Sequence, residues 1–150
     1  MGEDVGGQPD QRRDIERGQR VAIIELRAQR LHCYNGNYDD FIPATWKPGF
    51  VGMALRVFSP EAQRWSIYWL DNTTGGVDAA TGLLHPPVVG GFRDGVGIFE
   101  GQENFEGRPV RVRFEWSQMH TGAPRWQQAF SADGGATWEV NWVMEMARPV

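Results

Sequence analysis

The chain has 150 residues, which is the size of about one domain, and its 41% hydrophobic and 23% charged residues are typical of a globular protein. A formal net charge of −4 argues against nucleic acid and against an anionic membrane surface as partners. The sequence has no apolar run near the roughly 20 residues of a membrane span, and it has one cysteine, Cys33. Its first residues are polar, so we expect no secretory leader. We therefore expect a cytoplasmic protein without a disulfide, a metal site or another cofactor.

The amino-terminal third of the sequence gives the weakest indications of secondary structure. Residues 1–19 are rich in Gly, Asp, Gln and Arg, and they predict a flexible tail before a single domain over residues 20–150. Residues 21–31 fit either a helical stripe or an alternating strand, and we favour the strand. Residues 35–49 contain Asn-Gly and two prolines, which predicts a long loop over the core. The aromatic residues of that loop are Tyr38, Phe41 and Trp46.

The first clear pattern is a hairpin. Apolar residues alternate with others from 51 to 58 and again from 65 to 70, on either side of a turn at residues 59–63. If the two strands pair about that turn, their apolar partners share one face of the sheet. The expected pairs are Val57 with Trp65, Leu55 with Ile67, and Met53 with Trp69.

A second hairpin follows a connection rich in Gly and Thr at residues 71–87. Its strands are Val88–Phe92 and Val96–Phe99, and Asp94-Gly95 is a strong signal for a two-residue turn.

The last third predicts a meander of three strands. We expect Ser117 to lie opposite Arg125, and Ser131 to lie opposite Thr137. Three rows of side chains then share one face: Trp116–Trp126–Trp142, Phe114–Gln128–Val140 and Val112–Phe130–Trp138. The other face is expected to meet water and carries Arg111, Arg113, Glu115, Gln127, Glu139, Asn141 and Glu145.

These segments amount to seven strands, or to eight if residues 21–31 pair. Each strand is apolar on one side, and no helix is predicted to cover the sheet. Closing such a sheet on itself hides its apolar face and removes its edges. We therefore predict an all-β fold, an antiparallel β-barrel of about eight strands that is incompletely closed if the first strand does not pair, with a two-sheet sandwich as the alternative.

Several segments between residues 50 and 148 resemble a family of uncharacterised bacterial proteins. The segments are Arg64–Asp71, Pro86–Gly90, Gly95–Phe99, Gly107–Phe114, Trp126–Ser131 and Asn141–Met144. That family looks like the calycins, lipocalin-like barrels grouped near the domain-of-unknown-function family DUF1579. The resemblance implies a calycin-like barrel and no particular reaction. Residues 1–33 lack the Gly-x-Trp strand with which such proteins begin.

Residues 131–138 match the Asp-box pattern S-x-D-x-G-x-T-W of sialidase propellers. A propeller repeats this unit over several blades, and one copy predicts a structural role instead. We interpret it as a fastener of a hairpin. Asp133 would accept backbone hydrogen bonds, Gly134 and Gly135 would supply positive φ angles, and Trp138 would pack back onto the sheet.

Other reactive residue types form no convincing site. The histidines have no metal-ligand spacing and are expected at the surface or in packing roles: His32, His85 and His120. Cys33 has no neighbouring motif of a nucleophile. Asp39 and Asp40 resemble a carboxylate pair, but neighbours in sequence point in different directions, which favours a solvated loop.

The leading functional hypothesis is a module that binds a small hydrophobic or aromatic molecule inside the barrel. The predicted ligand-binding residues are Trp65, Trp69, Phe114, Trp116, Trp126, Gln128 and Trp142. Core packing explains the tryptophans equally well, whereas Gln128 is a buried amide that needs a partner. One alternative is a small isomerase or cyclase that uses the same cavity, with no catalytic residue identified. Another alternative is a barrel filled by its own side chains, with no ligand, that acts through a protein partner. The sequence does not decide whether the protein forms a homodimer.

Overall fold

The computed structural model describes residues 21–25, 29–30, 35–43 and 47–147. The tail predicted over residues 1–19 lies outside these residues, as do His32, Cys33 and Trp46. The described residues form a single sheet of ten strands, and none of them is helical. The strands are β1 (Val21–Glu25), β2 (Gln29–Arg30), β3 (Gly36–Phe41), β4 (Gly52–Ser59), β5 (Arg64–Asp71), β6 (Val88–Arg93), β7 (Val96–Phe105), β8 (Arg108–Ser117), β9 (Arg125–Ser131) and β10 (Glu139–Ala147).

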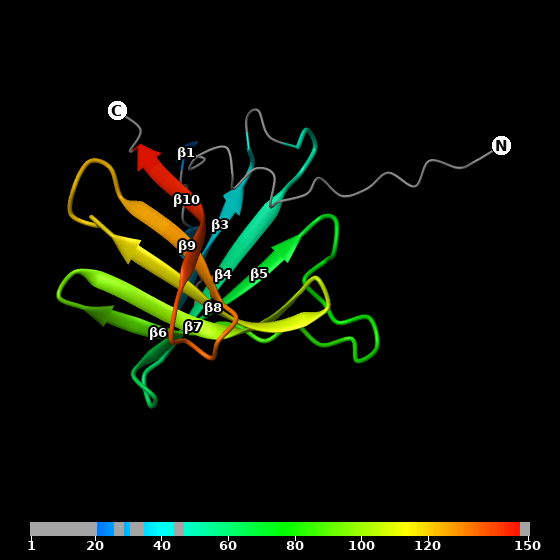
Figure 1. Cartoon of the computed structure of the whole chain (residues 1–150). Helices are drawn as coiled ribbons and strands as arrows, with labels where there is room; N and C mark the ends of the chain where they lie inside the picture. Colours follow the sequence, from blue (N-terminus) through cyan, green and yellow to red (C-terminus); the bar gives the residue numbers. More distant parts are fainter. Residues whose placement is uncertain (1–20, 26–28, 31–34, 44–46, 148–150) are drawn as a thin grey trace.

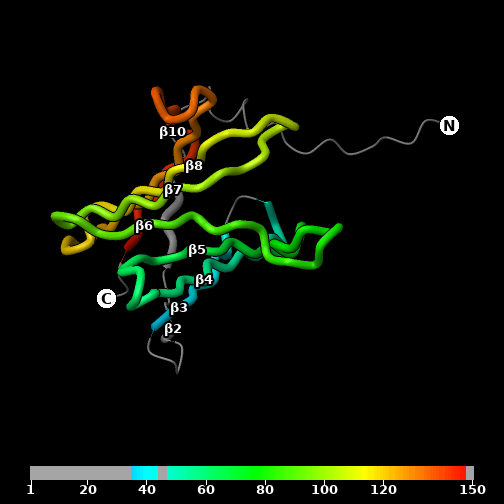
Figure 2. Tube along the Cα trace, turned by 90° about the horizontal axis from the view of Figure 1, so that it is seen from below, coloured from blue at the N-terminus to red at the C-terminus, as the bar shows by residue number. Residues whose placement is uncertain are grey.

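The sheet is an antiparallel meander from β3 to β10, in which each strand lies beside the next one in the chain. β1 joins one edge, parallel to β10, and β2 joins the other edge, antiparallel to β3. Only residues 26–28 connect these two edge strands, and an extended chain spans at most about 3.6 Å per residue. The two edges of the sheet are therefore held near each other, and the sheet is curled into a half-barrel (Figures 1 and 2).

The predicted all-β barrel-like fold is confirmed, together with several of its details. The preference for a strand in residues 21–31 is confirmed by β1 and β2. The hairpin around Asp94-Gly95 is formed by β6 and β7, and both turn residues have positive φ angles of 52° and 82°. β8 and β9 pair as expected, with Ser117 opposite Arg125 and Trp116 opposite Trp126.

The register predicted for the first hairpin is wrong by one residue. Trp65 lies opposite Phe58, Ile67 opposite Arg56, and Trp69 opposite Ala54. The reason lies in the turn, because Ser59 pairs with Arg64 while its hydroxyl accepts a hydrogen bond from the backbone N–H of Ala62 at 3.2 Å. A shift of one residue turns every side chain of one strand to the opposite face. Arg56 consequently points toward the interior, which had been assigned to Leu55 and Val57.

The loop predicted over residues 35–49 is also wrong in part, because residues 36–41 form β3. This strand pairs along its whole length with β4, from Gly36 opposite Val57 to Phe41 opposite Gly52. Its inward residues alternate in the manner of any strand with one buried face. These inward residues are Asn37, Asp39 and Phe41.

The meander departs from the prediction between β9 and β10. Thr137 is bound to Asp133 within the turn, so the ladder begins later, with Glu139 opposite Phe130. Val140 lies opposite Ala129, and a bulge at Asn141 then places Trp142 opposite Gln128. Because the ladder begins later than predicted, the side chain of Val140 lies on the outer face. The bulge then turns the side chain of Trp142 to the inner face. The predicted rows that joined Trp126 to Trp142, Gln128 to Val140 and Phe130 to Trp138 are therefore wrong.

The core lies on the concave face of the sheet. Its main cluster of buried residues contains Ile67, Val88, Phe99, Val112, Trp116, Trp126 and Met146. A second cluster is formed by Phe41 and Phe50. Trp142 packs against both clusters, and its ring lies 5.6 Å from that of Phe41. Side chains of β3 and β10 thus meet across the interior, although the strands lie near opposite edges of the sheet.

Candidate ligand-binding site

Aromatic rings fill one part of the interior. Ring contacts run from Phe114 to Trp126 at 4.9 Å, on to Trp142 at 5.6 Å, and from there to Phe41 at 5.6 Å. Trp69 continues this series, with its ring 6.1 Å from Phe41. All four pairs meet edge to face, which is a favoured arrangement for packed rings. The rings of Phe114, Trp126, Trp142 and Phe41 therefore fill this part of the half-barrel, and Trp69 lies at its exposed end.

A hollow of about 280 Å³ remains toward the end of the half-barrel that carries the β4–β5, β6–β7 and β8–β9 turns. Phe92, near the end of β6, and Met119, in the β8–β9 turn, line it at this end. The full lining is Asn37, Asp39, Arg56, Trp65, Ile67, Phe92, Phe99, Trp116 and Met119. Six of these nine side chains are apolar or aromatic, so the hollow has the composition of a small-molecule site.

The three polar side chains of the lining come from β3 and β4 and form one network. Arg56 donates from Nη1 to the amide oxygen of Asn37 at 3.1 Å and from Nη2 to the carboxylate of Asp39 at 2.9 Å. The Arg56 guanidinium also lies 5.2 Å from the centre of the Trp116 ring, within cation–π range. Asp39 is only 5% exposed. An ion pair thus lies inside an otherwise apolar hollow.

Burial and pairing act on Asp39 in opposite directions. Removal from water disfavours the charged carboxylate, and this effect raises the pKa of Asp39 above its ordinary value. The charge and the hydrogen bond of Arg56 oppose the rise without cancelling it. The Asp39 carboxyl is consequently easier to protonate than an exposed one.

The structure brings only two of the seven predicted ligand-binding residues to the hollow, Trp65 and Trp116. Phe114, Trp126 and Trp142 belong to the packed aromatic series, and Trp69 lies with Phe41 and Phe50. Gln128 donates to the amide oxygen of Asn141 at 3.1 Å, so its partner is the bulge residue of β10.

Sequence reasoning missed Asn37, Asp39 and Arg56. Asp39 and Asp40 do point in different directions, as expected of neighbours, but Asp39 is buried on a strand and not solvated in a loop. The alternation of Asn37, Asp39 and Phe41 was a strand signal that the nearby glycines and prolines obscured. Arg56 was missed because the hairpin register was wrong by one residue.

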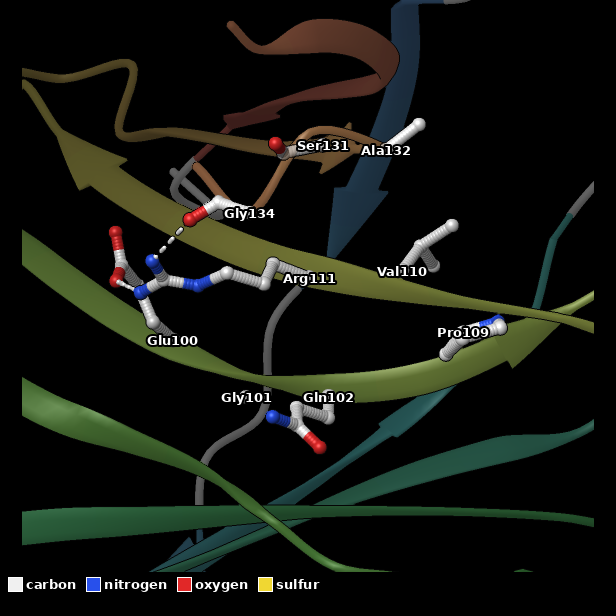
Figure 3. Close-up of a pocket in the computed structure, with 9 residues that line it drawn as sticks. All are labelled: Glu100, Gly101, Gln102, Pro109, Val110, Arg111, Ser131, Ala132 and Gly134. Atoms are coloured by element: carbon white, nitrogen blue, oxygen red, sulfur yellow. Dashed lines mark hydrogen bonds and ion pairs between the residues drawn. The ribbon is translucent and has the colours of Figure 1, made fainter. Parts of the chain in front are cut away.

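A second and larger depression, of about 570 Å³, lies on the outer face of β7 and β8. Figure 3 shows the Arg111 guanidinium between the Glu100 carboxylate and the Gly134 carbonyl, with a hydrogen bond of 2.9 Å to that carbonyl. Arg113 binds the same Glu100 carboxylate and lies 3.8 Å from the ring centre of Trp138. These groups bind one another at an open surface, so the largely apolar hollow is the better candidate for a ligand.

The Asp-box segment is a hairpin fastener, as predicted. Asp133 accepts hydrogen bonds from the Thr137 backbone at 2.9 Å and from the Ser131 and Thr137 hydroxyls. Gly134 and Gly135 have φ angles of 76° and 102°. These hydrogen bonds hold the pKa of Asp133 well below its ordinary value. The motif stabilises the β9–β10 turn and is not part of the hollow.

Comparison of the chain with protein-family models, with curated proteins and with solved structures finds no match. The resemblance to calycins therefore stays a prediction. Among the residues that the structure describes, no three His, Cys, Asp or Glu side chains are grouped as ligands for a metal. Within the same ranges there is no helix with the length and apolar character needed to cross a membrane. His85 and His120 are exposed and do not line the hollow.

Proposed function

We propose that the protein binds a small, largely apolar or aromatic molecule in the hollow of the half-barrel. The observation that carries this proposal is the hollow itself, in which Trp65, Trp116 and Phe99 line the same space as a buried ion pair. A buried ion pair in an apolar pocket costs stability compared with apolar residues of similar volume. Its presence supports a role in recognising a ligand.

The size of the hollow supports a small ligand. Its volume of about 280 Å³ lies just below the range of about 300–1,000 Å³ for small-molecule sites. One or two fused rings with a polar substituent suit this volume and the planar walls offered by Trp65 and Trp116. The same volume argues against a completely filled barrel that acts only through a protein partner.

Fluorescence titration tests the proposal, because two tryptophans line the hollow. Indole, toluene, benzamide and decanoic acid are each titrated while tryptophan emission and the melting temperature are recorded. At least one of them is expected to change the emission and raise the melting temperature, since binding to the folded state stabilises it. Failure of all four to change either quantity would overturn the proposal.

A matched pair of variants locates the response. Trp116→Phe removes an indole from the wall of the hollow, whereas Trp138→Phe removes one from the outer face beside Arg113. The emission change on ligand binding is expected to fall in Trp116→Phe and to persist in Trp138→Phe. The opposite result would place the ligand outside the half-barrel.

The position of Asp39 favours a second candidate function, an isomerase. Its buried carboxyl lines the hollow, and its raised pKa suits a group that exchanges a proton with a bound substrate. The carboxylate would take a proton from one carbon, and the resulting carboxyl would return it to another, without net oxidation or reduction. Exchange of ligand C–H for deuterium in D₂O, detected by NMR, would support this function if Asp39→Asn abolished it while the ligand still bound.

A further inference from the structure

The polar part of the hollow is confined to one patch of its wall. Asn37 and Asp39 lie two residues apart on the inner face of β3, and Arg56 lies opposite Asn37 on β4. The rest of the lining is apolar or aromatic and contributes no charge: Trp65, Ile67, Phe92, Phe99, Trp116 and Met119. The charged groups and the hydrogen-bond acceptors that side chains of the lining offer to a ligand therefore lie in this patch.

The patch is balanced in charge. Arg56 carries one positive charge and Asp39 one negative charge, 2.9 Å apart, and their side chains are 15% and 7% exposed. A carboxylate brought into the hollow would leave a net negative charge in an apolar setting, which is costly. A cationic ligand would leave a net positive charge at the same cost. An uncharged ligand leaves the pair balanced.

The patch also presents donors beside acceptors. The Arg56 guanidinium offers only N–H donors, and the Asp39 carboxylate offers only acceptors. The Asn37 amide offers both kinds of group, and its oxygen already accepts from Arg56. A ligand that meets this wall encounters N–H groups and carboxylate oxygens side by side. The matching chemical group is one that carries an acceptor and a donor on neighbouring atoms.

We infer that the ligand is an uncharged aromatic amide or lactam, whose carbonyl accepts from Arg56 and whose N–H donates to Asp39. This inference rests on the proposed function and adds the chemical class of the ligand. The ring would lie among Trp65, Trp116 and Phe99, where aromatic contacts add to the burial of its surface. The same patch would discriminate against aromatic acids and amines of identical size.

Benzamide and benzoate test the inference because they have the same ring and differ in the charge of the head group. Their affinities for the full chain are measured by isothermal titration calorimetry at neutral pH. Benzamide is expected to bind about tenfold or more tightly than benzoate, which corresponds to about 1.4 kcal/mol. Benzoate that binds as tightly as benzamide would overturn the inference and leave the proposed function intact.

The variant Asp39→Asn provides a second test of the inference. It keeps the size of the side chain and removes the negative charge, so Arg56 is no longer neutralised. Benzoate is expected to gain about tenfold in affinity relative to benzamide in this variant. A preference unchanged from the parent protein would overturn the inference.

Two outcomes separate the inference from the proposed function. If indole or toluene binds while benzamide does not, the inference fails and the proposed function stands. If none of indole, toluene, benzamide and decanoic acid binds, the proposed function fails. The comparison of benzamide with benzoate uses the unaltered protein, so it remains decisive even if Asp39→Asn does not fold.

Discussion

Arg56 lies directly opposite Asn37 in the β3–β4 ladder, yet its guanidinium also reaches Asp39, the next inward residue of the same strand. The Arg56 side chain thus forms hydrogen bonds with two successive inward residues of β3. β3 lies near an edge of the sheet, and its outer neighbour β2 pairs with it at two positions among the residues that the structure describes. The buried network therefore secures β3 as well as shaping the hollow.

Replacement of Arg56 by methionine is expected to lower the free energy of unfolding by about 3–5 kcal/mol, because it leaves the buried Asp39 carboxylate without its partner. Urea denaturation monitored by circular dichroism measures this change. The double variant Arg56→Met/Asp39→Leu is expected to recover most of the loss, since it removes both charges together.

The control for this prediction is Arg64→Met on the neighbouring strand β5, where Arg64 is exposed. An exposed arginine contributes little to stability, and the change is expected to stay within about 0.5 kcal/mol. If Arg56→Met were equally mild, the Asp39–Arg56 pair would not be the support for β3 that we describe.

The raised pKa of Asp39 predicts a specific dependence of stability on pH. Burial, only partly offset by Arg56, raises this pKa above its value of 3.8. The folded state therefore holds the proton of Asp39 more tightly than the unfolded state does. The contribution of this group to the unfolding free energy is greatest below pH 3.8 and declines as the pH rises through the folded pKa.

Asp39→Asn is expected to remove that decline. Unfolding free energies of both proteins are compared by urea denaturation from about pH 3 to about pH 7, and their difference isolates the titration of Asp39. A difference that does not change with pH would show that Asp39 has the same pKa in the folded and the unfolded chain.

Asp71 predicts the opposite sign. Burial acts to raise the pKa of Asp71, but hydrogen bonds from Thr73 and Thr74 outweigh it and lower the pKa from 3.8 to about 2. Two of these bonds come from the backbone N–H groups of Thr73 and Thr74, at 2.8 and 2.7 Å. Asp71 therefore stabilises the fold above pH 3.8, and this contribution is lost as the pH falls toward about 2.

Asp71→Asn is expected to weaken the fold at neutral pH and to reduce the further loss of stability in acid. Thermal melts between about pH 2 and about pH 6 measure both effects. Asp94→Asn, at the exposed turn between β6 and β7, is the matched control. Equal acid sensitivity of Asp71→Asn and the parent protein would contradict the role of these hydrogen bonds.

Gly52 and Gly91 form a matched pair of strand glycines. A Cβ atom at Gly52 would lie 2.3 Å from the Trp69 ring, whereas one at Gly91 would meet nothing within 4 Å. Gly52→Ala is therefore expected to displace the Trp69 indole and to cost about 1–3 kcal/mol of stability. Gly91→Ala is expected to be neutral or slightly stabilising.

Denaturation and tryptophan emission measure this pair of variants together. Gly52→Ala should change both the stability and the emission spectrum, because the Trp69 ring also contacts Phe41 and Phe50. Gly91→Ala should leave the spectrum unaltered. A Gly52→Ala variant with parental stability and emission would mean that Trp69 does not lie over Gly52.

Much of the inner face could be predicted from the sequence. The alternation of Val112, Phe114 and Trp116 with charged residues assigns these three residues to one surface of β8, and the structure places them there. Asp94-Gly95 and the Asp-box segment specify their turns through local backbone requirements. Such features depend on residues close together in the chain, so the sequence carries them directly.

The residues that line the hollow could not be predicted from such local features. The alternation in the sequence predicts that Arg56 faces outward. It faces inward because the β4–β5 turn contains four residues, Pro60 to Gln63, between the paired Ser59 and Arg64. Trp138 and Trp142 have the same spacing parity in the sequence, yet the bulge at Asn141 separates their faces. A one-residue difference in a turn or a bulge changes the local free energy little, but it turns every following side chain of the strand to the opposite face of the sheet.

Side chains alternate with a period of two along any strand, so the amino-acid pattern alone predicts an all-β chain with one aromatic face. Which residues meet inside the half-barrel depends on the three-dimensional arrangement of the strands. The contact between Arg56 and Asp39 depends on the register of two strands, and that between Phe41 and Trp142 depends on the curl of the entire sheet. Register and curl are set by the summed packing of strands distant in sequence, so no local pattern encodes them.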